Sequence, residues 1–181
     1  MGAYYQGTIA TKESEGEFTR YSTWDVKCGA KLMEHSYVFN GYVNAVLNKC
    51  PINEDFNLVW LCDYHEEKGF DWDCVSGSKD FENNNDQGFN TNYFINKSKG
   101  IYIDMVEVVA RYWNKGVKDY MIHPIPLLCN SDNEAMGGGD YREFDSRRGK
   151  WKDDIFIITW DAEKVKDLKN VTKDCLFFEK H

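Results

Sequence analysis

Leu58-Val59-Trp60-Leu61-Cys62 is a continuous apolar run, and Asp63-Tyr64-His65 follows it directly. A short apolar run without alternation is typical of a strand that is buried on both faces of a sheet. The run therefore predicts a strand in the interior of the fold. The polar residues behind it stand at the end of that strand, where loops usually carry binding and catalytic groups.

The N-terminal region predicts a β-hairpin. The β-prone stretches Tyr4–Ala10 and Phe18–Trp24 flank Ser14-Glu15-Gly16, which has the composition of a turn. An isolated pair of strands has little core of its own. The hairpin, residues 3–24, is therefore expected to project from the body of the protein.

The rest of the chain mixes helices with further strands. Ser36 is expected to cap a helix that Pro51 ends after Lys49, and Asp104 to cap a second helix that runs to Asn114. Strands are expected at Tyr93–Asn96, Ile101–Ile103, Tyr120–His123, Ile155–Trp160 and Val171–Phe178, with a short helix at Ala162–Lys169. Because no regular βαβ rhythm is present, the pattern predicts an α+β fold: one domain, residues 1–181, with a mainly antiparallel sheet and two or three helices.

Composition restricts the class of protein. The 181 residues are 42% hydrophobic and 15% aromatic, which is enough for a folded core. No apolar run approaches the ~20 residues that a membrane span needs, and the N-terminus lacks the features of a signal peptide, so a cytoplasmic protein is expected. The six cysteines include no Cys-x-x-Cys pair. Free thiols, no metal site and no cofactor are therefore expected.

Charge is distributed unevenly. Between Asn53 and Asn90, ten acidic residues stand against two lysines, and this segment alone carries the net charge of the whole chain, −8. The segment reads either as a solvated surface or as a face that docks on a basic partner. The residues assigned to partner binding are Asp71, Asp73 and Asp80.

Basic and aromatic residues are interleaved between Tyr141 and Lys152. This composition suits phosphate contact together with base stacking, and the plainer alternative is a solvated loop beside a strand. The residues assigned to RNA binding, here and in the N-terminal hairpin, are Lys12, Arg20, Tyr21, Arg142, Arg147 and Arg148.

Several chemically capable residues stand where apolar segments begin or end. Histidine suits acid–base work because its pKa lies near neutrality, and a histidine that precedes a proline is held rigidly. Each residue also has a structural alternative as a helix-entry, capping or packing group. The expected catalytic residues are Glu34, His35, Asp63, His123 and Asp140. Gly137-Gly138-Gly139 could approach a phosphate but lacks the Lys-Ser/Thr end of a P-loop.

Six motifs carry a resemblance to a known family: Met1–Tyr5, Lys31–Tyr37, Asn40–Val46, Trp60–Tyr64, His123–Leu128 and Gly137–Tyr141. In these motifs the chain resembles small proteins of Firmicute phages and mobile elements, among them anti-CRISPR inhibitors of type II-A Cas9 and members directed at the guide RNA. Cys62 stands where a relative can carry a small residue.

The resemblance implies an inhibitor that acts on the Cas9–guide RNA complex in the cytosol of the host bacterium. RNA can be cut without a metal because its 2′-hydroxyl is an internal nucleophile, so a ribonuclease-like truncation of the guide is compatible with these residues. The alternatives are a non-catalytic stoichiometric Cas9 blocker and an enzyme or sensor for a small phosphorylated ligand at the glycine run. The sequence leaves open whether the chain is catalytic, which Cas9 it binds and its oligomeric state.

Overall fold

The computed structural model describes residues 4–15, 17–21, 23, 28–63, 75–79, 92–131 and 146–178, with backbone only for 75–79. Its strands are β1 (Tyr5–Thr11), β2 (Phe18–Tyr21), β3 (Phe56–Cys62), β4 (Val75–Lys79), β5 (Tyr93–Asn96), β6 (Ile101–Asp104), β7 (Ile155–Thr159) and β8 (Lys169–Asn170). Its helices are α1 (Leu32–His35), α2 (Gly41–Lys49), α3 (Met105–Asn114) and α4 (Pro124–Leu128), with short 3₁₀ turns η1 (Lys12–Ser14), η4 (Ala162–Val165) and η5 (Thr172–Cys175).

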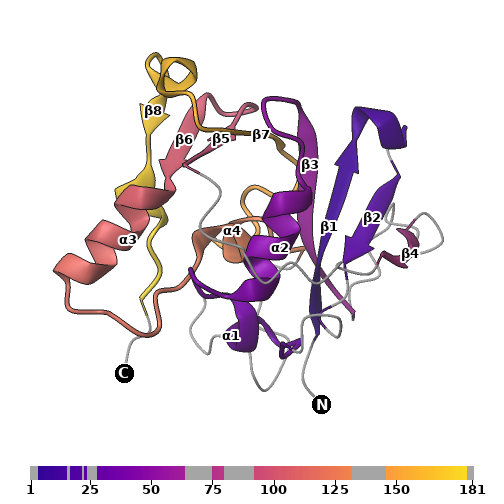
Figure 1. Ribbon diagram of the computed structural model, residues 1–181, viewed down its shortest axis with the longest axis horizontal. Coiled ribbons are helices and arrows are strands. Elements are labelled where there is room, and N and C mark those ends of the chain that lie inside the picture. Colours follow the sequence, from indigo (N-terminus) through magenta and orange to yellow (C-terminus); the bar gives the residue numbers. More distant parts are fainter. Residues whose placement is uncertain are drawn as a thin grey trace.

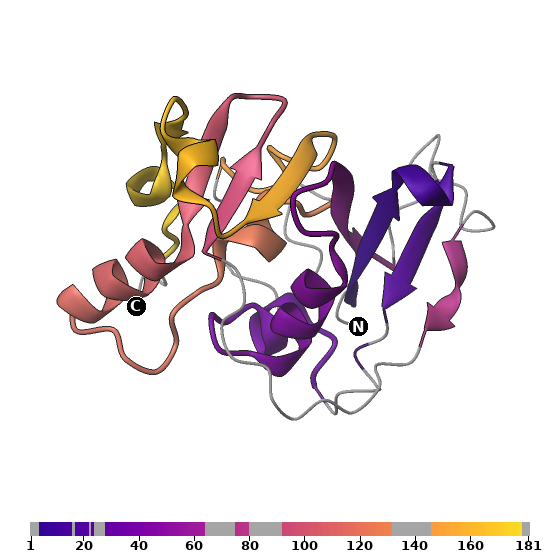
Figure 2. The same cartoon turned by 45° about the horizontal axis from the view of Figure 1, so that its top comes forward.

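The described strands form one sheet in the order β4-β2-β1-β3-β7-β5-β6-β8 (Figure 1). Five of the strand pairs are antiparallel, and the two pairs β2–β4 and β6–β8 are parallel. The predicted α+β class with a mainly antiparallel sheet is therefore confirmed. The turned view in Figure 2 shows the β1–β2 hairpin and helix α3 at opposite ends of the molecule.

Strand β3 is the centre of the fold, as its apolar run predicted. Residues Leu58–Cys62 are all buried, and Trp60 is completely enclosed. Along one edge β3 pairs with β1 from Tyr5↔Cys62 to Thr11↔Phe56. Along the other edge it pairs with β7 at Phe56 and then, at Trp60, with the segment that follows α4. Strands β1 and β7, which are far apart in the sequence, thus pair with opposite edges of the same buried strand.

The N-terminal hairpin forms but does not project. Strand β1 lies between β2 and β3, so both of its edges are paired. Tyr5 and Ile9 on β1 and Tyr21 on β2 belong to the hydrophobic core. The expectation of a free arm is corrected because the pairing of β1 with β3 joins segments about fifty residues apart, which no local pattern in the hairpin announces.

The helix starts were predicted with mixed success. Asp104 caps α3 as expected, since its Oδ1 accepts from the backbone N–H groups of Val106 (2.9 Å) and Glu107 (3.0 Å). Helix α2 is capped by Asn40, not by Ser36. Ser36 instead closes the one-turn helix α1, because its N–H donates to the Leu32 carbonyl at 3.0 Å.

Two C-terminal expectations are also corrected. The strand expected at Val171–Phe178 is not formed: the turn η5 and an extended tail occupy this range, and the short strand β8 precedes it. The segment before Pro124 does not form the expected strand: Ile122 makes an isolated bridge with Tyr37, which lies outside the sheet, and Pro124 then opens the unpredicted helix α4. Proline at the first helical position explains this start, since its missing N–H costs nothing there.

Two glycines offer a matched test of the packing between β1 and α2. A Cβ added at Gly7 would lie 2.7 Å from Cγ1 of Val46 and 3.3 Å from Cη2 of Trp60, whereas one at Gly41 would meet nothing within 4 Å. We expect Gly7→Ala to lower the free energy of unfolding by about 1–3 kcal/mol through overpacking. Gly41→Ala should raise it by about 0.4–1 kcal/mol, because alanine favours the helix and restricts the unfolded chain.

Urea denaturation of both variants beside the wild type checks this pair. Equal effects of the two substitutions would mean that α2 does not pack closely on β1.

Candidate functional site

His35 is held inside the core by both nitrogens of its ring. Its Nε2 lies 2.9 Å from Nε1 of Trp60, and its Nδ1 lies 3.0 Å from the carbonyl oxygen of Gly29. Because the indole N–H can only donate, Nε2 must accept, and the proton of the neutral imidazole then resides on Nδ1 and is donated to Gly29. Both ring nitrogens are therefore bonded within the fold, which leaves neither open to a substrate.

His123 is the N-cap of α4. Its Nδ1 accepts from the backbone N–H of Ile125 at 3.2 Å, and its side chain is buried. The backbone N–H of His123 donates to the backbone carbonyl of Ser36 at 2.9 Å, so the segments around Ser36 and His123 lie side by side. The cap gives the histidine before Pro124 a structural role at the start of α4.

Burial changes the titration of both imidazoles. Desolvation lowers the pKa of His35 to about 4 and that of His123 to about 3, because the charged form loses its hydration in the core. Both rings are neutral at pH 7. A base with so low a pKa has little driving force to take a proton from a hydroxyl group.

The predicted carboxylates also make hydrogen bonds to the backbone. Oε2 of Glu34 accepts from the N–H of Lys31 at 3.0 Å and closes the first turn of α1. Oδ1 of Asp63 accepts from the N–H of Tyr4 at 2.9 Å and fixes the start of β1 beside the end of β3. Asp140 lies outside the described residues. We assign structural roles to the four predicted residues that the structure describes. Their catalytic role stays a prediction, because the hydrogen bonds described above connect each of them to other groups and not to one another.

Two of the arginines assigned to RNA are used by the protein itself. Nη1 of Arg147 donates to the carbonyls of Asp174 and Leu176, both at 2.7 Å, and its guanidinium lies 4.3 Å from the ring centroid of Phe177. Arg148 is buried and donates to the hydroxyl of Tyr5 at 2.8 Å. These contacts give both side chains a structural role, and their assignment to RNA binding stays a prediction.

The remaining assigned residues divide by exposure. Lys12 is exposed in the turn η1, Arg20 is half-buried on β2, and Tyr21 is buried. Among the three hairpin residues assigned to RNA binding, Lys12 is thus the exposed one. Four assigned residues lie outside the described part of the chain: Asp71, Asp73, Asp80 and Arg142.

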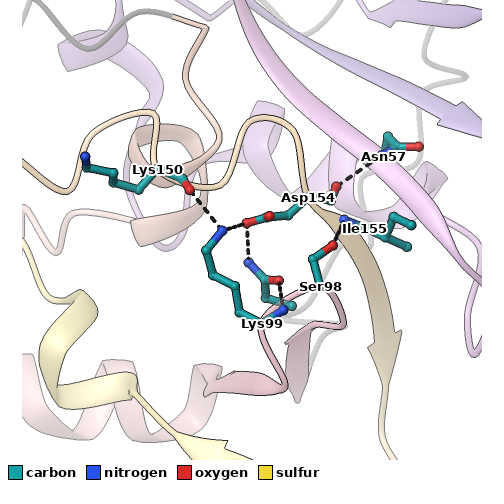
Figure 3. Close-up of polar contacts among 7 residues, drawn as sticks. Asn57, Ser98, Lys99, Lys150, Asp154 and Ile155 are labelled. Atoms are coloured by element: carbon teal, nitrogen blue, oxygen red, sulfur yellow. Dashed lines mark hydrogen bonds and ion pairs between the residues drawn. The ribbon is translucent and has the colours of Figure 1, made fainter.

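Sequence reasoning missed a polar cluster around Asp154, which we call the Asp154 cluster (Figure 3). Oδ2 of Asp154 binds the ammonium group of Lys99 and accepts from Nδ2 of the buried Asn96 at 2.7 Å. The same ammonium donates to the carbonyl of Lys150 at 3.1 Å, and Nδ2 of Asn57 donates to the carbonyl of Asp154 at 3.1 Å.

The cluster ties the β5–β6 turn to β3 and to the segment before β7. Its side chains form hydrogen bonds and an ion pair within the protein, so we assign the cluster a stabilising role and not a catalytic one. In the sequence these residues look like ordinary surface charges, and only their pairing across the sheet distinguishes them.

A pocket of about 340 Å³ lies beside the end of α3, and none of the predicted catalytic residues lines it; we call it the α3 pocket. Its lining combines four aromatic rings with a valine, a lysine and an aspartate. The lining residues are Tyr112, Val117, Lys118, Asp119, Tyr120, Phe177 and Phe178. The signal that could have found it is the aromatic and basic composition of the segment 112–120.

The described cysteines are free and mostly buried: Cys28, Cys50, Cys62, Cys129 and Cys175. The expectation of free thiols is confirmed for these five. Burial raises the pKa of Cys129 well above its usual range, and the same cause raises that of Cys175 to about 12. Thiols held in the neutral form are poor nucleophiles, so neither is a candidate for covalent chemistry.

Acid is expected to destabilise the protein through the two buried histidines. The unfolded chain protonates them below a pH of about 6.5, whereas the folded protein does so only near the lowered pKa values of about 4 and about 3. Between these limits the unfolded state binds more protons, so stability is complete above pH ~6.5 and is lost as the pH falls. By pH ~5.5 the loss should be about 1.4 kcal/mol for each histidine.

Urea denaturation at pH ~7.5 and pH ~5.5 measures this loss. His123→Asn keeps a capping side chain without a titratable ring, so it should remove one histidine's share of the pH dependence. An unchanged pH dependence in this variant would contradict the low pKa of His123.

The described residues contain no group of three His, Cys, Asp or Glu side chains placed to hold a metal ion. Among them, too, no helix has the length and apolar character needed to cross a membrane. Comparison with protein-family models, with curated proteins and with solved structures finds no match to this chain.

Proposed function

We propose that this chain acts by binding, as a stoichiometric blocker of a Cas9–guide RNA complex that breaks no bond in its target. The identity of the partner is supported by the sequence motifs that resemble anti-CRISPR proteins. The mode of action is supported by the hydrogen bonds of the predicted catalytic residues.

The observation that carries the mode is the double hydrogen bond of His35. Metal-free RNA cleavage needs a group that takes the proton of the 2′-hydroxyl. His35 has both nitrogens engaged, to Trp60 and Gly29, and His123 caps α4 from inside the core. The two histidines predicted to act as acid–base groups thus form hydrogen bonds inside the protein. A blocker needs no acid–base group, only a surface that complements its partner.

The acidic segment is the surface that we assign to docking. It carries the whole net charge of the chain, −8, and a nucleic-acid-binding partner presents a basic face that such a segment complements. Complementary charge mainly speeds association, and salt screens it. Binding should therefore weaken as salt is raised.

The experiment incubates the protein with Cas9 and end-labelled guide RNA, measures target-DNA cleavage, and resolves the guide on a denaturing gel. We expect inhibition that is complete near a one-to-one ratio, with the guide intact. Truncation of the guide at substoichiometric protein would replace the blocker with a nuclease. Full Cas9 activity at excess protein would remove Cas9 as the partner.

A matched pair of charge-reversal variants tests the docking surface. Lysine at Asp71, Asp73 and Asp80 should weaken binding and flatten its salt dependence. Lysine at Asp153, Asp167 and Asp174, which are exposed and lie outside the acidic segment in the sequence, changes the net charge equally and should have a smaller effect. Equal effects of the two variants would mean that net charge acts, and not this segment.

A further inference from the structure

We propose that the α3 pocket binds a nucleotide, either free or as one unit of a single-stranded RNA. This inference goes beyond the proposed function and does not depend on Cas9. It rests on the aromatic lining of the pocket, on two lysines at its edge and on the exposure of these groups.

The lining offers rings on which a flat base can stack. Tyr120 and Phe178 border the pocket and are 68% and 41% exposed, although large aromatic side chains usually lie inside a protein. Tyr112 completes the wall, and its hydroxyl donates to the Phe177 carbonyl at 2.6 Å, which fixes the C-terminal segment beside α3. The wall is therefore built into the fold. Stacking on such rings tolerates any base, because every base has a π-face.

Two ammonium groups supply positive charge at the same place. Lys115 lies 4.3 Å from the ring centroid of Phe178, and Lys118 lies 5.1 Å from that of Trp113. Within the described part of the chain neither lysine forms an ion pair with a carboxylate. Each is held on an aromatic face with its charge available to a phosphate.

Asp119, also in the lining, adds one carboxylate. A carboxylate can accept hydrogen bonds from ribose hydroxyls or from an exocyclic amino group of a base. The local balance of two lysines and one aspartate suits a ligand that carries both an anionic group and hydrogen-bond donors. The overall charge of −8 does not oppose this, because charges beyond a Debye length of ~10 Å are largely screened.

The volume of about 340 Å³ is at the lower end of the range for small-molecule sites, about 300–1,000 Å³, and fits one nucleotide unit. An apolar peptide would use the rings but would leave the lysines without partners. A simple anion such as phosphate would use the lysines but would leave the rings bare. A nucleotide uses both.

The test uses the full chain without Cas9. Fluorescence anisotropy with a fluorescein-labelled RNA of about ten nucleotides, and saturation-transfer NMR with AMP and ATP, measure binding at low and at moderate salt. Tyr120→Ala should weaken binding about tenfold, which corresponds to the loss of one stacked base. Lys118→Ala should reduce the salt dependence by about one phosphate contact.

Trp160→Ala and Lys169→Ala are the controls, since they remove an exposed aromatic ring and an exposed lysine that do not line the pocket. Melting temperatures of all four variants identify any general loss of folding. Binding of both AMP and RNA assigns free nucleotides as ligands, and binding of RNA alone assigns a strand. No binding at millimolar nucleotide and micromolar RNA, or equal losses in pocket and control variants, would overturn the proposal.

Discussion

His35→Leu is expected to lower the free energy of unfolding by about 3–4 kcal/mol. Leucine cannot accept a hydrogen bond, so the indole N–H of the fully buried Trp60 would lose its acceptor, at a cost of about 1–3 kcal/mol. The edge-on contact between the rings of His35 and Tyr42, with centroids 5.1 Å apart, would be lost as well.

His35→Gln is the matched control for this substitution. The glutamine amide oxygen can replace Nε2 as the acceptor for Trp60, so we expect less than half of the loss. Thermal or urea unfolding of both variants measures the difference. A leucine variant as stable as the wild type, but inactive, would return His35 to a catalytic role.

Asp154→Ala is expected to cost about 2–4 kcal/mol of stability. The substitution removes the acceptor of Nδ2 of Asn96, which is fully buried, and the charged partner of Lys99. Hydrogen bonds to charged groups contribute about 1.5–3 kcal/mol, and a buried amide without a partner adds its desolvation cost. The β5–β6 turn would also lose one of its ties to the segment before β7, the contact of the Lys99 ammonium with Asp154 that Figure 3 shows.

The same turn provides a control. Lys97 binds Asp55 at 2.6 Å in a pair of the same chemistry, but its side chain is 53% exposed and that of Asp55 is 24% exposed. Exposed ion pairs contribute about 0–1 kcal/mol, so Asp55→Ala should be nearly neutral. Comparable losses for Asp55→Ala and Asp154→Ala in denaturant titrations would show that burial of Asn96 is not the cause.

Local patterns in the chain predicted the elements that depend on neighbours in sequence. Helix α3 begins at its Asp104 cap, strands β5 and β6 pair in the expected hairpin, and α2 ends before Pro51. The start of α2 was missed because both Ser36 and Asn40 are good caps. The choice between them depends on the one-turn helix α1, which His35 holds against Trp60.

The candidate site was predicted less well than the fold, for a related reason. His35, His123 and Asp63 were correctly singled out as polar groups at the ends of apolar segments. Their roles depend on partners, and a histidine that caps a helix has the same sequence signature as one that moves a proton. Burial and hydrogen bonding decide between these roles, and the sequence states neither.

Hydrophobic periodicity and capping act over a few residues, so local patterns were sufficient to predict the buried central strand, the capped helix α3 and the α+β class. The interior position of β1, the hydrogen bond from Arg148 to Tyr5 across 143 residues of chain and the contact between Lys99 and Asp154 became apparent in the folded molecule alone. Such pairings depend on which segments the collapse of the core brings together. Their free energy comes from the burial of groups that are distant in sequence, so no local pattern can encode them.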